Sequence, residues 1–180
     1  TTATITLPTY YKAGEKFVAW HSGSASGTVT TQITKGSTGN KTFYAEMTDC
    51  PAGSVCSASD ITECPANSYC PLGSSIAISC STVGGGLYKS SDAGSDKAND
   101  CFFATTAGKY LANATDTAET QCKGFVYCPS ETLYYPNVNE PTACPGAELT
   151  RDSNGAIVTD ASGYQTVTAT DLDSKKMTVV

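Results

Sequence analysis

The chain has 180 residues, a formal net charge of −6 at pH 7, and charged side chains at only 16 % of its positions. Such a chain lacks the Lys and Arg excess with which proteins neutralise phosphates, and no apolar run approaches the roughly 18 residues of a transmembrane helix, so we expect neither nucleic-acid binding nor a membrane span. Threonine and serine occupy 46 positions and cysteine nine. Cysteine-dense chains of this kind are stabilised by disulfides, which persist in oxidising compartments. We therefore expect an extracellular or cell-surface protein.

The first 48 residues lack cysteine and show the alternation of β-strands. Period-2 patterns and β-branched residues predict strands over residues 3–7, 16–20, 29–34 and 42–45. Phe17 and Trp20 are three positions apart, and a strand that buries both side chains needs a bulge or a bend. The predicted core of this segment consists of Phe17, Trp20, Ile33, Phe43 and Ala45.

Three motifs in this segment occur in the order and spacing of a known repeat. They are Leu7-Pro8-Thr9, Lys12-Ala13-Gly14 with Phe17 and Trp20, and Thr38-Gly39-Asn40-Lys41-Thr42-Phe43-Tyr44-Ala45. Over residues 3–47 the chain thus resembles the Listeria–Bacteroides repeat, also called the internalin B-repeat, from which it departs at Glu15, Ala19 and Met47. The resemblance implies a small β-grasp-like module of the kind that bacterial surface proteins repeat as a spacer or adhesion unit, without catalysis.

Cysteine spacing organises the middle of the chain. Three stretches have five residues between two cysteines, and Cys101 begins a related unit; the three are Cys50–Cys56, Cys64–Cys70 and Cys122–Cys128. Repetition of a short unit predicts a row of small elements, none of which buries a core alone. Over residues 50–146 these units resemble the tandem ephrin-receptor-like and growth-factor-like repeats of extracellular proteins. The spacing does not fit the close cysteine pairs of a zinc site, and we expect no metal or other cofactor.

Nine cysteines leave at least one thiol without an internal partner. If the second cysteine of each unit joins the next one along the chain, the disulfides are Cys56–Cys64, Cys70–Cys80, Cys101–Cys122 and Cys128–Cys144. Cys50 would then be unpaired or form an intermolecular bond. Interleaved pairing of the growth-factor kind, Cys50–Cys64 with Cys56–Cys70, is the alternative, because spacing alone does not determine connectivity.

Few other side chains suggest a chemical role. A calcium loop would use oxygen ligands at the spacing of Asp92, Asp96 and Asp100, but the segment contains a lysine and lacks the bidentate glutamate of such loops, so an exposed connector is the alternative. Two asparagines, Asn40 and Asn113, match the N-glycosylation acceptor pattern. The only histidine, His21, has no acidic partner nearby in the sequence, so it indicates no catalytic triad. We expect no enzyme.

The segment after Cys144 predicts further strands at residues 155–159, 164–170 and 176–180, with few apolar partners of their own. The family that the first segment resembles carries a strand ahead of the Leu7-Pro8 motif, and here six residues precede that motif. An open strand edge is a template for another strand. We therefore expect strand exchange with a second copy, or with an adjoining repeat of the same protein, through Thr4, Ile5 and Thr6 at one end and Lys176, Met177, Thr178, Val179 and Val180 at the other.

These features together predict an all-β protein with a β-grasp-like module over residues 1–48, a disulfide-rich repeat module over 49–146 and a β-strand tail over 147–180. The predicted function is a structural building block of an extracellular filament or cell-surface adhesin that assembles head to tail. The alternative is an adhesin whose cysteine-rich loops bind a host protein or glycan. In that case Tyr134 and Tyr135 are a candidate contact patch, although packing over the adjacent cysteine loop is the simpler role for them.

Overall fold

A computed structural model describes residues 1–57, 60–124, 126–144 and 147–169. These residues form short β-strands and turns together with two single-turn 3-10 helices, η1 (Cys80–Thr82) and η2 (Ala98–Asp100), and four disulfides cross-link them. The predicted all-β, disulfide-rich fold class is confirmed. Within this described part, no helix has the length and apolarity of a membrane span.

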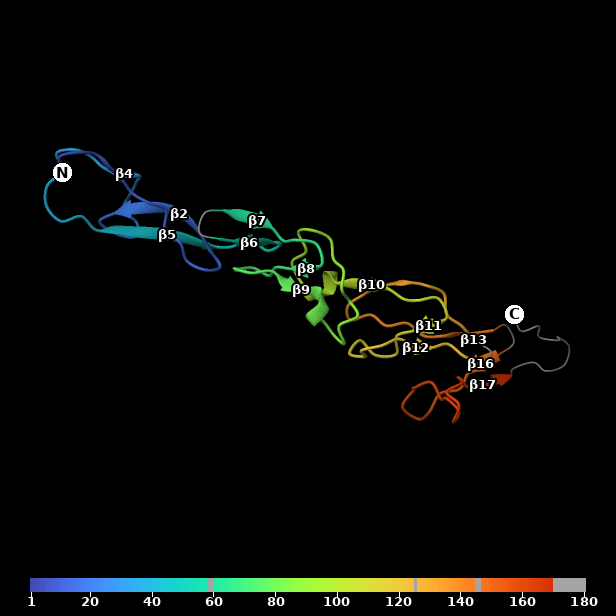
Figure 1. The fold of residues 1–180 in the computed structure, drawn as a ribbon. Helices are drawn as coiled ribbons and strands as arrows, with labels where there is room; N and C mark the ends of the chain where they lie inside the picture. The colour runs from blue at the N-terminus through green and yellow to red at the C-terminus, as the bar shows by residue number, and fades with distance from the viewer. Residues whose placement is uncertain (58–59, 125, 145–146, 170–180) are drawn as a thin grey trace. The chain divides into compact units, whose positions relative to one another are not determined.

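The chain divides into two compact units, Thr1–Ser79 with Ser91–Asp100, and Cys80–Ser90 with the residues from Cys101 onward. The first unit begins with an antiparallel sheet in which β2 (Glu15–Ser22) lies between β3 (Thr28–Thr30) and β5 (Phe43–Asp49) (Figure 1). A second, two-stranded sheet pairs β1 (Ile5–Thr6) with β4 (Gln32–Ile33). The strand predicted over residues 29–34 is thus divided at Thr31, because its first half pairs with β2 and its second half with β1.

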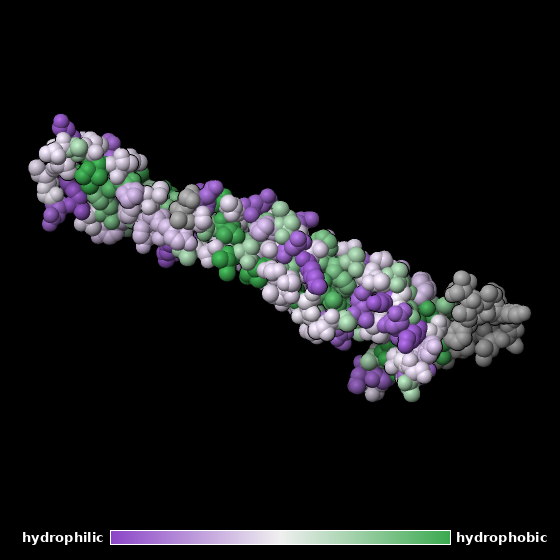
Figure 2. All heavy atoms as spheres, in the orientation of Figure 1, coloured by the Kyte–Doolittle hydropathy of each residue, from purple (hydrophilic) through white to green (hydrophobic). Residues whose placement is uncertain are grey.

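A bulge in β2 positions the aromatic side chains of this sheet. Pairing between β2 and β5 shifts register between Phe17 and Ala19, which confirms the predicted bulge. The rings of Phe17 and Trp20 then lie 5.5 Å apart, and Trp20 also meets the edge of Tyr10 at 6.2 Å. The five predicted core residues are half-buried rather than buried, because so small a sheet covers its own side chains only in part. Apolar residues, green in Figure 2, are accordingly visible at the surface of the molecule.

A four-residue turn recurs along the chain, from the start of β2 onward. Its third residue has a positive φ, near +80° at the glycines, as a type II turn requires, and in most copies the fourth N–H donates to the first carbonyl. We call these five segments glycine turns: Lys12–Glu15, Pro51–Ser54, Pro71–Ser74, Asp92–Ser95 and Thr106–Lys109. A sixth turn, 65–68, has Asn67 at the third position with a φ of 64°.

In the first unit these turns associate in reciprocal pairs. The Gly53 N–H donates to the Cys70 carbonyl and the Gly73 N–H to the Cys50 carbonyl, both at 2.8 Å. The next pair of turns repeats the exchange with the Asn67 N–H on the Ser91 carbonyl, 3.0 Å, and the Gly94 N–H on the Cys64 carbonyl, 2.8 Å. The hairpins that these turns begin are β6 (Ser54–Cys56) with β7 (Ile61–Glu63), and β8 (Ser68–Tyr69) with β9 (Ile78–Ser79).

Ahead of the tail, the second unit contains three strand pairs and an aromatic core. Its pairs are β10 (Phe102–Ala104) with β14 (Thr132–Tyr134), β11 (Lys109–Tyr110) with β12 (Thr120–Gln121), and β13 (Val126–Tyr127) with β15 (Thr142–Ala143). The fully buried Tyr88 ring meets Phe103 at 5.2 Å and Tyr135 at 5.4 Å, and its hydroxyl donates to the Asn137 carbonyl at 2.6 Å. Burial raises the pKa of Tyr88 above its usual value. Tyr135 therefore packs in the core, whereas Tyr134 is exposed.

The described part of the tail pairs with itself. Strand β16 (Ala147–Leu149) is antiparallel to β17 (Val167–Ala169), with isolated bridges between Arg151 and Ile157 and between Thr159 and Gln165. The expectation that residues 164–170 have no evident partner in their own module is therefore wrong for Val167–Ala169. Two tight loops, after Asp152 and after Asp160, bring β17 back to β16. In each loop the aspartate carboxylate accepts backbone N–H groups two and four residues later, so the chain reverses direction twice. The other predicted strand, Lys176–Val180, lies outside the described residues.

Candidate functional site

Disulfide connectivity differs from the predicted one. The bonds join Cys50 to Cys56, Cys64 to Cys70, Cys80 to Cys101, and Cys122 to Cys128, and Cys144 is the free cysteine. Both pairings considered from the sequence are therefore wrong, and so is the assignment of the unpaired thiol to Cys50.

A turn with a positive φ at its third residue explains why a bond closes within each of the first two units. Reversal at Gly53 brings the Cα atoms of Cys50 and Cys56 to 5.7 Å, and the equivalent turn at Asn67 brings those of Cys64 and Cys70 to 5.8 Å. Both separations lie in the range that a disulfide bridges without backbone movement. All four of these cysteines are at most 1 % exposed. The buried disulfides therefore fill the interior of these units, where a larger domain would have apolar side chains.

The free cysteine begins a unit that lacks its second cysteine. In three of the four disulfides the partners are six positions apart. Thr150 stands six positions after Cys144, where the repeat would place the partner. The odd thiol is therefore explained by a degenerate last unit rather than by a missing first one.

Hydroxyl residues replace cysteine ahead of two glycine turns. Ser91 and Thr105 stand three residues before Gly94 and Gly108, as Cys50 stands before Gly53, and they are 4 % and 2 % exposed. The Ser91 hydroxyl donates to the Ser68 carbonyl at 2.7 Å, and the Thr105 hydroxyl accepts from the Glu131 N–H at 2.8 Å. A small hydroxyl side chain that is hydrogen-bonded within the chain thus occupies the buried position of the cysteine without forming a disulfide. The recurring Ala-Gly dipeptide of these turns is a signal that a count of cysteines alone overlooks.

The calcium candidates are engaged with neighbouring protein groups. Burial disfavours the charged form of Asp100, but backbone N–H groups of Asp96 and Lys97 donate to its carboxylate and, with the Lys97 ammonium, lower its pKa overall. Lys97 lies within 3.5 Å of both Asp96 and Asp100. Asp92 accepts the Ser95 hydroxyl at its backbone carbonyl. No group of three or more metal-ligating side chains occurs in the part of the chain that the structure describes.

His21 holds the first sheet together. Its Nδ1 lies 2.8 Å from the Gly27 carbonyl and its Nε2 2.8 Å from a carboxylate oxygen of Glu46 on β5. Both neighbours are acceptors, so both ring nitrogens carry a proton in the arrangement that satisfies them. The Gly27 carbonyl and then the Glu46 carboxylate raise the pKa of His21, against a smaller opposing effect of burial. The sequence did not show this acidic partner, because β5 brings it from 25 residues away.

A buried glutamine that sequence reasoning missed, Gln165, docks the tail onto the rest of the second unit. Gln165 is 2 % exposed. Its side-chain oxygen accepts from the Lys123 N–H at 2.6 Å, and its side-chain nitrogen donates to the Gln121 carbonyl at 3.1 Å. The amide thereby makes the hydrogen bonds that the backbone of a neighbouring strand would make.

The predicted glycosylation sites Asn40 and Asn113 are both exposed.

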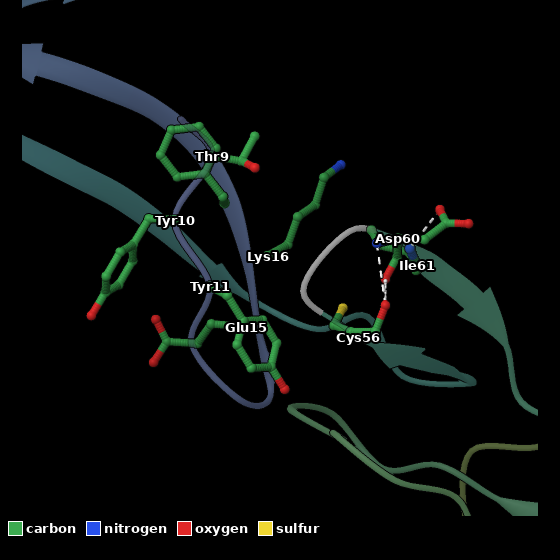
Figure 3. Close-up of a pocket in the computed structure, with 10 residues that line it drawn as sticks. Thr9, Tyr10, Tyr11, Glu15, Lys16, Cys56, Asp60 and Ile61 are labelled. Carbon is green, nitrogen blue, oxygen red and sulfur yellow. Dashed lines mark hydrogen bonds between the residues drawn. The ribbon is translucent and has the colours of Figure 1, made fainter. Parts of the chain in front are cut away.

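Each unit contains a pocket among its described residues. The pocket of the first unit, of about 310 Å³, is lined by the segment Thr9–Tyr11, by the start of β2, and by Cys56, Ser57, Asp60 and Ile61 (Figure 3). The second, of about 320 Å³, lies beside Tyr110, Asn113 and the Asn154-Gly155 loop, and its carboxylate, Glu140, is held by Arg151. The first pocket carries exposed aromatic rings, since Tyr10 and Tyr11 are 49 % and 45 % exposed.

Comparison of the sequence with family models and curated proteins, and with solved structures, found no match. The resemblance of residues 3–47 to internalin B-type repeats, and of residues 50–146 to ephrin-receptor-like and growth-factor-like repeats, therefore stays a prediction.

Proposed function

We propose that the chain is a structural building block of an extracellular filament or cell-surface adhesin. The observation that supports this most is the self-similar glycine turn, which occurs in both units and, in the first unit, binds to other copies of itself by backbone hydrogen bonds. Repeated elements of this kind gain stability from their neighbours rather than from a single core. Four disulfides in a chain of this length fit an oxidising, extracellular location.

Assembly would proceed by strand pairing between copies. Both residues of β1 are exposed, and β1 pairs on one side with β4 in a two-stranded sheet, so its outer edge is open to a further strand. The proposed donor is Lys176–Val180, on the strength of its sequence. Because donor and acceptor are different segments of the chain, such a contact is heterologous and generates a filament unless the rotation closes a ring.

The test is concentration-dependent assembly of the chain with and without residues 174–180. Sedimentation and electron microscopy of the full chain should show ordered polymers as its concentration rises, and the truncated chain should remain monomeric with its disulfides intact. A matched control replaces Lys176 and Met177 by proline, which removes the donor N–H groups without changing the length. Polymers formed equally well by the truncated chain, or a full chain that stays monomeric at every concentration, would refute the assembly proposal.

A second candidate function is supported by the pocket beside the β6–β7 loop. It gives the adhesin alternative a definite location, because the cysteine-rich hairpin supplies Asp60 and Ile61 to the same pocket as Tyr10 and Tyr11. The two functions are distinguished by what the chain binds. A monomer that binds a ligand at this pocket supports the adhesin, and a chain that binds a second copy along β1 supports the building block.

A further inference from the structure

We infer that the pocket of the first unit binds a neutral carbohydrate. This inference deepens the second candidate function and does not depend on assembly. It begins from Tyr10 and Tyr11, two aromatic residues that line the pocket and are about half exposed. Sugar rings present an apolar face of C–H groups, which packs on an aromatic face, and hydroxyl groups around the rim, which need polar partners.

The tyrosines are held in place before any ligand arrives. Trp20 Nε1 donates to the Pro8 carbonyl at 2.6 Å, which fixes the segment Thr9–Tyr11 against β2. On the same segment, the Tyr10 ring meets the edge of the Trp20 ring. Tyrosine also loses little side-chain freedom on binding because it has only two χ angles. A platform ordered in this way avoids much of the entropy cost of binding.

Polar groups surround the platform on more than one side. In Figure 3 the Lys16 side chain extends between the segment that carries Thr9 and the loop that carries Asp60. Asp60 uses one carboxylate oxygen to accept the Ile61 N–H at 2.8 Å, which orients the group and leaves its second oxygen to accept from a ligand hydroxyl. Lys16 is exposed and offers ammonium donors to a ligand oxygen.

The charges of the pocket select a neutral ligand. Glu15 is neutralised by an ion pair with Lys12, and Lys16 and Asp60 contribute one charge of each sign. An acidic sugar would meet the Asp60 carboxylate and the net charge of −6 on the chain. The cavity of about 310 Å³ is at the small end of ligand pockets, which hold roughly 300–1,000 Å³, so the site fits a short segment of a glycan rather than a broad protein surface.

Trp20 provides the assay, because it is the only tryptophan in the chain and contacts Tyr10. A set of neutral oligosaccharides, first screened on an array, is titrated while Trp20 fluorescence is recorded. At least one should give a saturable change. Tyr10→Ala and Asp60→Asn, of which the second keeps the oxygen that accepts the Ile61 N–H, should each weaken binding about tenfold.

Two controls distinguish binding at this pocket from nonspecific binding. Tyr127→Ala removes a tyrosine of the other unit that is 53 % exposed and should leave the affinity unchanged. An array of acidic glycans should give weaker binding than the neutral one. The inference is overturned if no neutral oligosaccharide binds up to millimolar concentration, or if Tyr10→Ala and Asp60→Asn bind as tightly as the parent chain; neither result bears on the assembly test.

Discussion

Replacement of Gly53 by alanine tests the packing of the glycine turns. Gly53 has a φ of 76°, and a Cβ atom built there would lie 2.4 Å from the Gly94 carbonyl oxygen. The positive φ costs a residue with a side chain about 1–2 kcal/mol, and forcing apart two backbone segments costs about 1–3 kcal/mol more. Movement of the turn also strains the hydrogen bonds that Gly53 makes with Cys70 and Cys64. We therefore expect a total loss of about 2–5 kcal/mol in the free energy of unfolding.

Gly36→Ala is the matched control, because Gly36 has a φ of 89° in the same unit and nothing within 4 Å of its Cβ position. It should lose only the conformational cost of about 1–2 kcal/mol. Differential scanning calorimetry measures both variants, at about 4–8 °C in midpoint for each kcal/mol in a domain of this size. Hydrogen exchange at Cys64 and Gly94 would locate the damage. Equal midpoints for the two variants would refute the close approach of the turns.

Three further predictions concern single side chains. Gln165→Ala removes the two hydrogen bonds that the buried amide makes with Lys123 and Gln121 and should cost about 1–3 kcal/mol, seen as faster hydrogen exchange over residues 147–169; exchange no faster than in the parent chain would contradict the docking. Because the pKa of His21 is raised in the folded chain, its contribution is complete below the unfolded value of about 6.5 and is lost as the pH rises through the folded value. Urea unfolding followed by Trp20 fluorescence should therefore show a more stable sheet at pH 6 than at pH 8.5, and Glu46→Gln should reduce the difference; a flat profile in the parent chain would exclude the contact. Thr150→Cys should form a fifth disulfide with Cys144, so that the count of titratable thiols falls to zero instead of rising to two, whereas an exposed control, Ser153→Cys, should raise it.

Local pattern was sufficient for the first sheet. The alternation around Phe43 and the three-residue spacing of Phe17 and Trp20 predicted strand β5 and the bulge in β2, because both depend on which face a side chain occupies. The division of the predicted third strand at Thr31 did not follow from the sequence, since β-branched residues fit either partner strand equally well.

Long-range geometry accounts for the errors. The cysteine pairing was wrong because it treated each unit as a link to the next, whereas the turn at Gly53 closes the unit on itself. The Glu46 partner of His21 and the docking of Gln165 depend on strands that meet only in the folded chain. The pocket, likewise, joins Tyr10 to Asp60 across 50 positions of sequence, and nothing in either local pattern relates the two residues.

Peptide mapping of the unreduced protein tests the central claim, that cysteines six positions apart close a disulfide within their own unit instead of linking one unit to the next. Free thiols are blocked at low pH, the chain is digested without reduction, and the linked peptides are identified by mass spectrometry with partial reduction. The account predicts the bonds Cys50–Cys56, Cys64–Cys70, Cys80–Cys101 and Cys122–Cys128, with the blocking group on Cys144. A blocked Cys50 together with Cys56–Cys64 and Cys128–Cys144 bonds would contradict it, because the units would then be linked to their neighbours instead of closed on themselves.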